Sequence, residues 1–90
     1  MKEVIIFTKA SCLFCAMIKS NLTKEGIPFY DVDIVKNHDF WESIMNQTGN
    51  DKLIPTVIIK DENDNSGLAY VPGKDFKDTD ELLELIKKNI

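Results

Sequence analysis

Short apolar runs alternate with segments of helical periodicity in the first half of this 90-residue chain. Val4 to Phe7 is a continuous apolar run, typical of a central strand buried on both faces. After a turn from Thr8 to Ser11, the residues from Cys12 to about Lys24 place their apolar positions at helical spacing. Phe29 to Ile34 alternates apolar and acidic residues, which predicts a more peripheral strand. This order indicates a strand-helix-strand unit with parallel strands.

The second half of the chain predicts another helix, a hairpin and a closing helix. A helix begins at Asn37 or His38 and runs to about Thr48, with an apolar face of Phe40, Trp41, Ile44 and Met45. Strands at 56–59 and 68–71 flank a polar loop from Asp61 to Gly67, which favours antiparallel pairing. Asp78 or Thr79 caps the last helix, whose apolar residues are Leu82, Leu83, Leu85 and Ile86. The pattern therefore predicts one α/β domain over residues 1–90, ordered β-α-β-α-β-β-α around a four-stranded mixed sheet.

Composition narrows the class of protein without identifying it. Hydrophobic residues make up 43% of the chain and charged residues 29%, as in ordinary globular domains. The net charge of -4 and the dispersed basic residues argue against a nucleic-acid partner. The apolar stretch after Met1 is too short for a signal peptide, and no apolar run reaches the roughly twenty residues that span a bilayer. We therefore expect a cytoplasmic monomer that does not associate with membranes.

The candidate chemistry lies in the cysteine pair Cys12 and Cys15. Cys12 falls between the predicted first strand and the predicted first helix, at the helix N-terminus. We expect its sulfur to lie near unpaired backbone N–H groups and the positive end of the helix dipole, both of which favour the thiolate. Cys15 lies about one helical turn later and is placed to attack a mixed disulfide formed at Cys12. Two buried structural cysteines are the simplest alternative. A zinc site is another, but it needs further ligands and the chain has a single histidine, His38.

Three motifs occur in the order and at the separation found in glutaredoxins: the segment from Thr8 to Cys15, then Ile54-Pro55-Thr56, then Gly73-Lys74-Asp75. The chain resembles a dithiol glutaredoxin over essentially its whole length. The resemblance implies the thioredoxin fold with sheet order 2-1-3-4, an antiparallel third strand and helices on both faces. It also implies a cis peptide bond between Ile54 and Pro55, and no bound metal or tightly held cofactor.

By this resemblance glutathione is the co-substrate, and the implied contacts are Lys9, Phe14, Ile54, Pro55, Gly73, Lys74 and Asp75. Lys9 would meet a glutathione carboxylate, and Lys52 resembles a basic residue that often precedes the proline segment. Asp75 either accepts from the glutathione ammonium or opens the last helix as an acidic residue. The chain departs from the family pattern at Leu13-Phe14, where many members have Pro-Tyr, and at Pro72, which replaces the first glycine of the usual pair. Leu13 and Phe14 are expected to be exposed beside the sulfur, where they suit docking of a protein disulfide.

Three functional hypotheses follow. The first is a glutathione-dependent thiol–disulfide oxidoreductase that reduces protein disulfides and glutathione mixed disulfides, with Cys12 attacking and Cys15 resolving. The second is a glutaredoxin-like electron donor, for instance to ribonucleotide reductase, that is itself reduced by thioredoxin reductase. The third, disfavoured by the presence of Cys15, is a carrier that holds an iron–sulfur cluster between two chains. His38 and Trp41 are interpreted as a helix-cap residue and a core aromatic.

Overall fold

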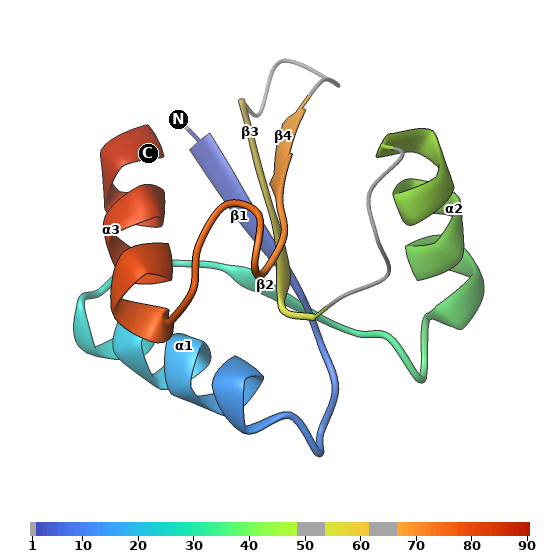
Figure 1. The fold of residues 1–90 in the computed structure, drawn as a ribbon, viewed down its shortest axis with the longest axis horizontal. Helices are drawn as coiled ribbons and strands as arrows, with labels where there is room; N and C mark the ends of the chain where they lie inside the picture. Colours follow the sequence, from blue (N-terminus) through green and yellow to red (C-terminus); the bar gives the residue numbers. More distant parts are fainter. Residues whose placement is uncertain (1, 49–53, 62–66) are drawn as a thin grey trace.

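The computed structural model describes residues 2–48, 54–61 and 67–90, and its elements follow the predicted order (Figure 1). They are β1 (Lys2–Thr8), α1 (Leu13–Lys24), β2 (Tyr30–Asp33), α2 (His38–Thr48), β3 (Thr56–Asp61), β4 (Gly67–Tyr70) and α3 (Thr79–Asn89). Residues 62–66 of the predicted hairpin loop and Lys52, with its suggested role, lie outside the described residues, whereas Asp61 ends β3 and Gly67 begins β4. No helix in the described part of the chain is long and apolar enough to cross a membrane.

The four strands form one mixed sheet in the order β2-β1-β3-β4, as predicted. β1 pairs with β2 in parallel and with β3 antiparallel, and β3 pairs antiparallel with β4. β1 therefore occupies a central position, which explains its continuous apolar run. β2 is an edge strand, in accord with its alternating acidic residues.

Helices cover both faces of this sheet. α1 and α3 lie on one face and α2 lies on the other (Figure 1). Alternate β1 residues supply the two cores, because successive side chains of a strand point to opposite faces. Val4 and Ile6 pack with residues of α1 and α3, whereas Phe7 packs with Trp41 and Met45 of α2. The core facing α1 and α3 also contains Ile18, Leu22, Val57, Ile59, Phe76, Leu82 and Ile86.

Some boundaries and one face differ from the sequence predictions. β2 is shorter than predicted by one residue at each end, and β4 lies one residue earlier in the chain. The sequence predicted Phe40 on the apolar face of α2. That prediction is wrong, because Phe40 is 52% exposed. Each residue of a helix turns the side chain by about 100°, so Phe40 sits at the border of the stripe that Trp41 occupies. Its ring still touches the edge of the core, with its centroid 6.0 Å from that of Phe7.

Candidate active site

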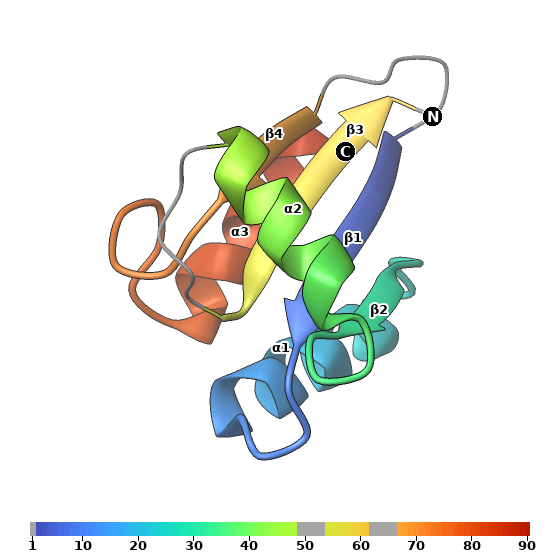
Figure 2. The same cartoon turned by 90° about the vertical axis from the view of Figure 1, so that its right-hand side faces the viewer.

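The sheet register brings the three sequence motifs to one end of the molecule. Phe7, just before the cysteine-bearing turn, pairs with Thr56, which follows the Ile54-Pro55 segment. Val57 in turn pairs with Tyr70, at the end of the strand that leads into the Gly73 turn. Figure 2 shows the turn between β1 and α1 at the same end of the sheet as the start of β3. Backbone pairing alone therefore places the motifs side by side.

Cys12 is the N-cap residue of α1, with an extended backbone (φ -90°, ψ 109°). Its Sγ accepts a hydrogen bond from the Cys15 backbone N–H at 3.1 Å. The Cys12 N–H donates to the carbonyl oxygen of Lys9 at 3.0 Å, which closes the turn. Cys12 is partly exposed. The predicted place of this sulfur at the helix N-terminus is thus present in the structure, and a solvent-accessible sulfur there can act as a nucleophile.

Cys15 contrasts with Cys12 in exposure and charge. It lies within α1 on the stripe that also carries Ile18 and Leu22, and it is fully buried. Burial, together with the hydrogen bond to the Cys12 side chain, raises the pKa of the Cys15 thiol from 9.0 to about 12. Cys15 is therefore a protonated thiol at neutral pH. The pair consists of a partly exposed Cys12 and a buried, protonated Cys15 whose thiol interacts with the Cys12 side chain.

A polar group behind this helix was not anticipated from the sequence. Lys19 of α1 donates through Nζ to Oδ2 of Asp31 at 2.9 Å, and the Thr8 hydroxyl donates to the other Asp31 oxygen. The spacing of four between Cys15 and Lys19 is visible in the sequence, as is the alternation that turns Asp31 to one face of β2. The sequence does not reveal that Asp31 pairs with Ile6 in the sheet. This register places the Asp31 side chain on the face of the sheet that α1 covers.

The proline segment has the predicted cis peptide bond between Ile54 and Pro55. Pro55 is fully buried, and Ile54 is partly buried against the core of Phe7, Trp41 and Met45. The backbone around this bond is thereby held against the end of the sheet.

The turn after β4 is closed by its own hydrogen bonds. The Gly73 N–H donates to the Phe76 carbonyl at 2.8 Å, and Gly73 has a φ of +83°, a conformation that favours glycine. Asp75 accepts through Oδ2 from the Val71 N–H at 2.8 Å. The alternative role of Asp75 as the residue that opens the last helix is wrong, because Asp78 caps α3 and accepts from the Glu81 N–H. Lys74 is exposed on this turn.

Leu13 and Phe14 do not behave alike. Leu13 is 76% exposed beside Cys12, as predicted. Phe14 is partly buried, so its predicted exposure is wrong. Its ring packs against Phe76, with centroids 5.8 Å apart, and joins the core between α1 and α3. This contact ties the cysteine-bearing helix to the turn that carries Gly73.

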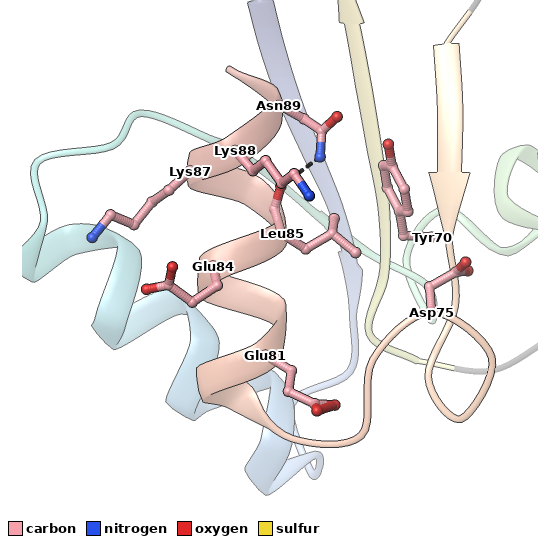
Figure 3. A pocket seen from close by; sticks show the side chains of 8 residues that line it. All are labelled: Tyr70, Asp75, Glu81, Glu84, Leu85, Lys87, Lys88 and Asn89. Atoms are coloured by element: carbon pink, nitrogen blue, oxygen red, sulfur yellow. Dashed lines mark hydrogen bonds between the residues drawn. The ribbon is translucent and has the colours of Figure 1, made fainter.

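Asp75 also borders a depression of about 780 Å³ between β4 and α3 (Figure 3). Its lining residues are Tyr70, Asp75, Glu81, Glu84, Leu85, Lys87, Lys88 and Asn89. Charges of both signs surround it, and neither cysteine belongs to the lining. The depression therefore adjoins the candidate site only through the Asp75 turn.

No group of three or more potential metal ligands gathers within the described ranges. His38 is exposed at the start of α2, near the carboxylates of Asp39 and Glu42 at 3.9 and 3.7 Å. Trp41 is a core residue, as interpreted, and its buried Nε1 has no hydrogen-bond partner among the residues described.

Comparison with known proteins adds family and fold. A family model described as glutaredoxin matches residues 4–63. No curated protein matches the chain. One solved structure, a malarial protein, is 23% identical, covers 100% of this chain and 98% of its own, and superposes with a TM-score of 0.62. Glutaredoxin from Brucella melitensis is 20% identical over 96% of this chain and 79% of its own, with a TM-score of 0.53.

The thioredoxin Deadhead from Drosophila melanogaster is 18% identical over 99% of this chain and 81% of its own, with a TM-score of 0.62. Likeness at these identities concerns the fold, which is the predicted thioredoxin fold. The family model covers 60 of the 90 residues, including both cysteines and the proline segment. This chain belongs to the glutaredoxin family and is a thiol–disulfide oxidoreductase.

Proposed function

We propose that the chain is a dithiol glutaredoxin that uses glutathione to reduce protein disulfides and glutathione mixed disulfides. The Cys12 thiolate attacks the substrate disulfide, a bond forms to the Cys12 sulfur, and one substrate sulfur leaves as a thiol after taking a proton. Cys15 then attacks the Cys12 sulfur, which forms the Cys12–Cys15 disulfide and releases the second thiol. Two glutathione molecules reduce this disulfide and leave as oxidised glutathione.

The observation that carries the proposal is the asymmetry of the two sulfurs. Cys12 is accessible at the N-cap and accepts the Cys15 N–H at 3.1 Å, whereas Cys15 is buried and its pKa is raised to about 12. A disulfide that approaches from solvent meets Cys12 first. Cys15 stays protonated until a mixed disulfide has formed above it, so the order of attack follows from burial and charge.

Residues around Cys12 offer suitable partners for glutathione. Lys9 is exposed on the turn before Cys12, where its ammonium can pair with a glutathione carboxylate. The backbone of Ile54, ahead of Pro55, can pair with the cysteinyl backbone of glutathione. Gly73, Lys74 and Asp75 lie on the turn that adjoins Phe14 through Phe76, where the Asp75 carboxylate can meet the γ-glutamyl ammonium. In this arrangement Phe14 packs against Phe76 and so supports the turn, and it does not itself contact glutathione.

The test compares two reducing systems on one substrate. Reduction of a glutathione mixed disulfide is followed by NADPH consumption, either with glutathione and glutathione reductase or with thioredoxin reductase alone. We expect turnover with glutathione and none with thioredoxin reductase. Turnover only with thioredoxin reductase would instead establish the electron-donor hypothesis and reject glutathione dependence.

Two variants separate the roles of the cysteines. Cys12→Ser retains an oxygen that can cap α1, so it should fold and yet lose turnover completely. Cys15→Ser retains the nucleophile and should still exchange glutathione mixed disulfides, while losing reduction of protein disulfides. Equal activity of Cys12→Ser and the unaltered protein contradicts the assignment of the nucleophile.

A further inference from the structure

Lys19 lies on the helix that Cys12 caps and forms an ion pair with the edge strand of the sheet. It lies four residues after Cys15, which puts it one turn further along the same side of α1. Its side chain is 31% exposed, and its ammonium pairs with Asp31 of β2 at 2.9 Å. The pair joins α1 to the edge strand at the level of the sheet where the cysteine-bearing turn begins.

The other end of this ion pair is attached to the sheet. Thr8 is 2% exposed, and its hydroxyl donates to the second oxygen of Asp31. The Thr8 carbonyl accepts from the Ile34 N–H at 2.9 Å, which closes the sheet end next to β2. Burial raises the pKa of Asp31, but the hydrogen bonds from Thr8 and Lys19 and the charge of Lys19 outweigh it, so the net pKa lies below its ordinary value. Asp31 is therefore a fixed carboxylate at neutral pH.

Several groups act on the Cys15 thiol in opposite directions. Burial and the Cys12 side chain raise its pKa, as described above, whereas a backbone hydrogen bond with Lys9 and the charge of Lys19 lower it. The Lys19 ammonium thus favours the thiolate that Cys15 must form in order to attack. Proton loss from Cys15 is the costly part of the resolving step, because a buried thiol is neutral at working pH.

We propose that Lys19, held by Asp31 and anchored through Thr8, is a positioning residue that speeds the resolving attack of Cys15. The inference rests on the proposed function, since it concerns the second step of the dithiol mechanism. In that step the Cys15 thiol loses its proton, a sulfur–sulfur bond forms between Cys15 and Cys12, and the bond from Cys12 to the substrate sulfur breaks. The departing thiolate takes up a proton, so the substrate is reduced and the cysteine pair is oxidised without a further reagent.

The two steps can be timed separately with 5,5'-dithiobis(2-nitrobenzoic acid). Attack by Cys12 releases a first equivalent of coloured thionitrobenzoate, and attack by Cys15 on the mixed disulfide releases a second, both followed by stopped-flow absorbance. Lys19→Gln removes the charge, Lys19→Arg keeps it, and Asp31→Ala removes the anchor. Lys87→Gln is the matched control, because it breaks another inter-element ion pair, with Glu25 at 3.2 Å, on the surface.

In Lys19→Gln we expect the second phase to slow on the order of threefold to tenfold, as befits a partly exposed charge, with the first phase unchanged. The pH midpoint of the second phase should move upward, and added salt should slow the unaltered protein toward the variant. Lys19→Arg should keep both rate and midpoint, and Lys87→Gln should match the unaltered protein. Asp31→Ala removes the anchor of Lys19 but also a carboxylate whose negative charge opposes the thiolate, so it should slow the second phase less than Lys19→Gln.

The inference is overturned if Lys19→Gln releases the second equivalent at the unaltered rate, or if the rate falls while the pH midpoint stays in place. Failure of the proposed function gives a different result. In that case the unaltered protein shows no first phase that depends on Cys12.

Discussion

The burial of Cys15 predicts that the two thiols of the reduced protein differ greatly in reactivity. The perturbation is alkylation of the folded protein with iodoacetamide, a small reagent that reacts with thiolates. Cys12 is partly exposed and should be modified first. Cys15 is fully buried, and its proton is retained because burial and the Cys12 side chain both favour the neutral thiol.

The magnitude follows from the pKa. A rise from 9.0 to about 12 reduces the thiolate fraction of Cys15 at neutral pH about a thousandfold relative to an ordinary cysteine. Limited access of the reagent lowers the rate further. Because the folded pKa lies above the ordinary value, the stability that Cys15 contributes is complete below pH 9 and is lost as the pH rises toward about 12. Below its pKa, the thiolate fraction of Cys15 rises tenfold for each pH unit, so the rate of Cys15 alkylation should rise about tenfold per pH unit between pH 9 and the pKa of about 12.

The assay is time-resolved alkylation followed by peptide mass spectrometry at several pH values. In the folded protein we expect Cys12 to be labelled to completion at neutral pH while Cys15 remains unmodified. Both should react alike in denaturant, which serves as the control for reagent and digestion. Labelling of Cys15 at a rate within tenfold of Cys12 at neutral pH refutes the assignment of a buried, protonated resolving thiol.

Three further predictions concern the framework that holds the site. Asp78→Ala removes the α3 N-cap and should cost about 1 kcal/mol of unfolding free energy in urea, whereas Asp80→Ala, two residues further on in the first helical turn, should cost less. Gly73→Ala meets no atom within 4 Å, so its cost comes from the backbone at φ +83° alone and should be about 1–2 kcal/mol in the same measurement. Leu22→Ala opens a cavity beneath α1 and should lower stability by about 2–5 kcal/mol in thermal or urea unfolding, and a loss below 1 kcal/mol contradicts the fully buried position.

Local patterning predicted the elements that place the cysteines. A continuous apolar run predicted the central strand. The change to helical spacing after it predicted that Cys12 lies at the start of α1. Burial of Cys15, Ile18 and Leu22 on one stripe followed from the helical period. The sheet order and the cis bond before Pro55 came from family resemblance, because nothing in local periodicity fixes which strands become neighbours.

Two features that the sequence did not predict share a physical cause, which is contact between residues far apart in the chain. Phe14 looks exposed from its position beside Cys12, but Phe76, 62 residues later, covers its ring. The pairing of Lys19 with Asp31 was not predicted, and the two meet because the β1–β2 register turns Asp31 toward α1. Asp75 could have capped the last helix by residue type, yet Asp78 lies closer to the helix start and takes that position.

The hydrogen bond from the Cys15 N–H to the Cys12 sulfur links folding and chemistry in this site. An α-helix leaves its first N–H groups without intrahelical partners, and an N-cap side chain satisfies the one three positions on. Here the cap is the proposed nucleophile, and the residue three positions on is the proposed resolving cysteine. The hydrogen bond holds the Cys12 sulfur at the helix terminus, where a disulfide that approaches from solvent can reach this partly exposed residue. The spacing of the two cysteines therefore puts the Cys12 sulfur on the N–H of Cys15, and it does so with a bond that α1 needs in order to begin.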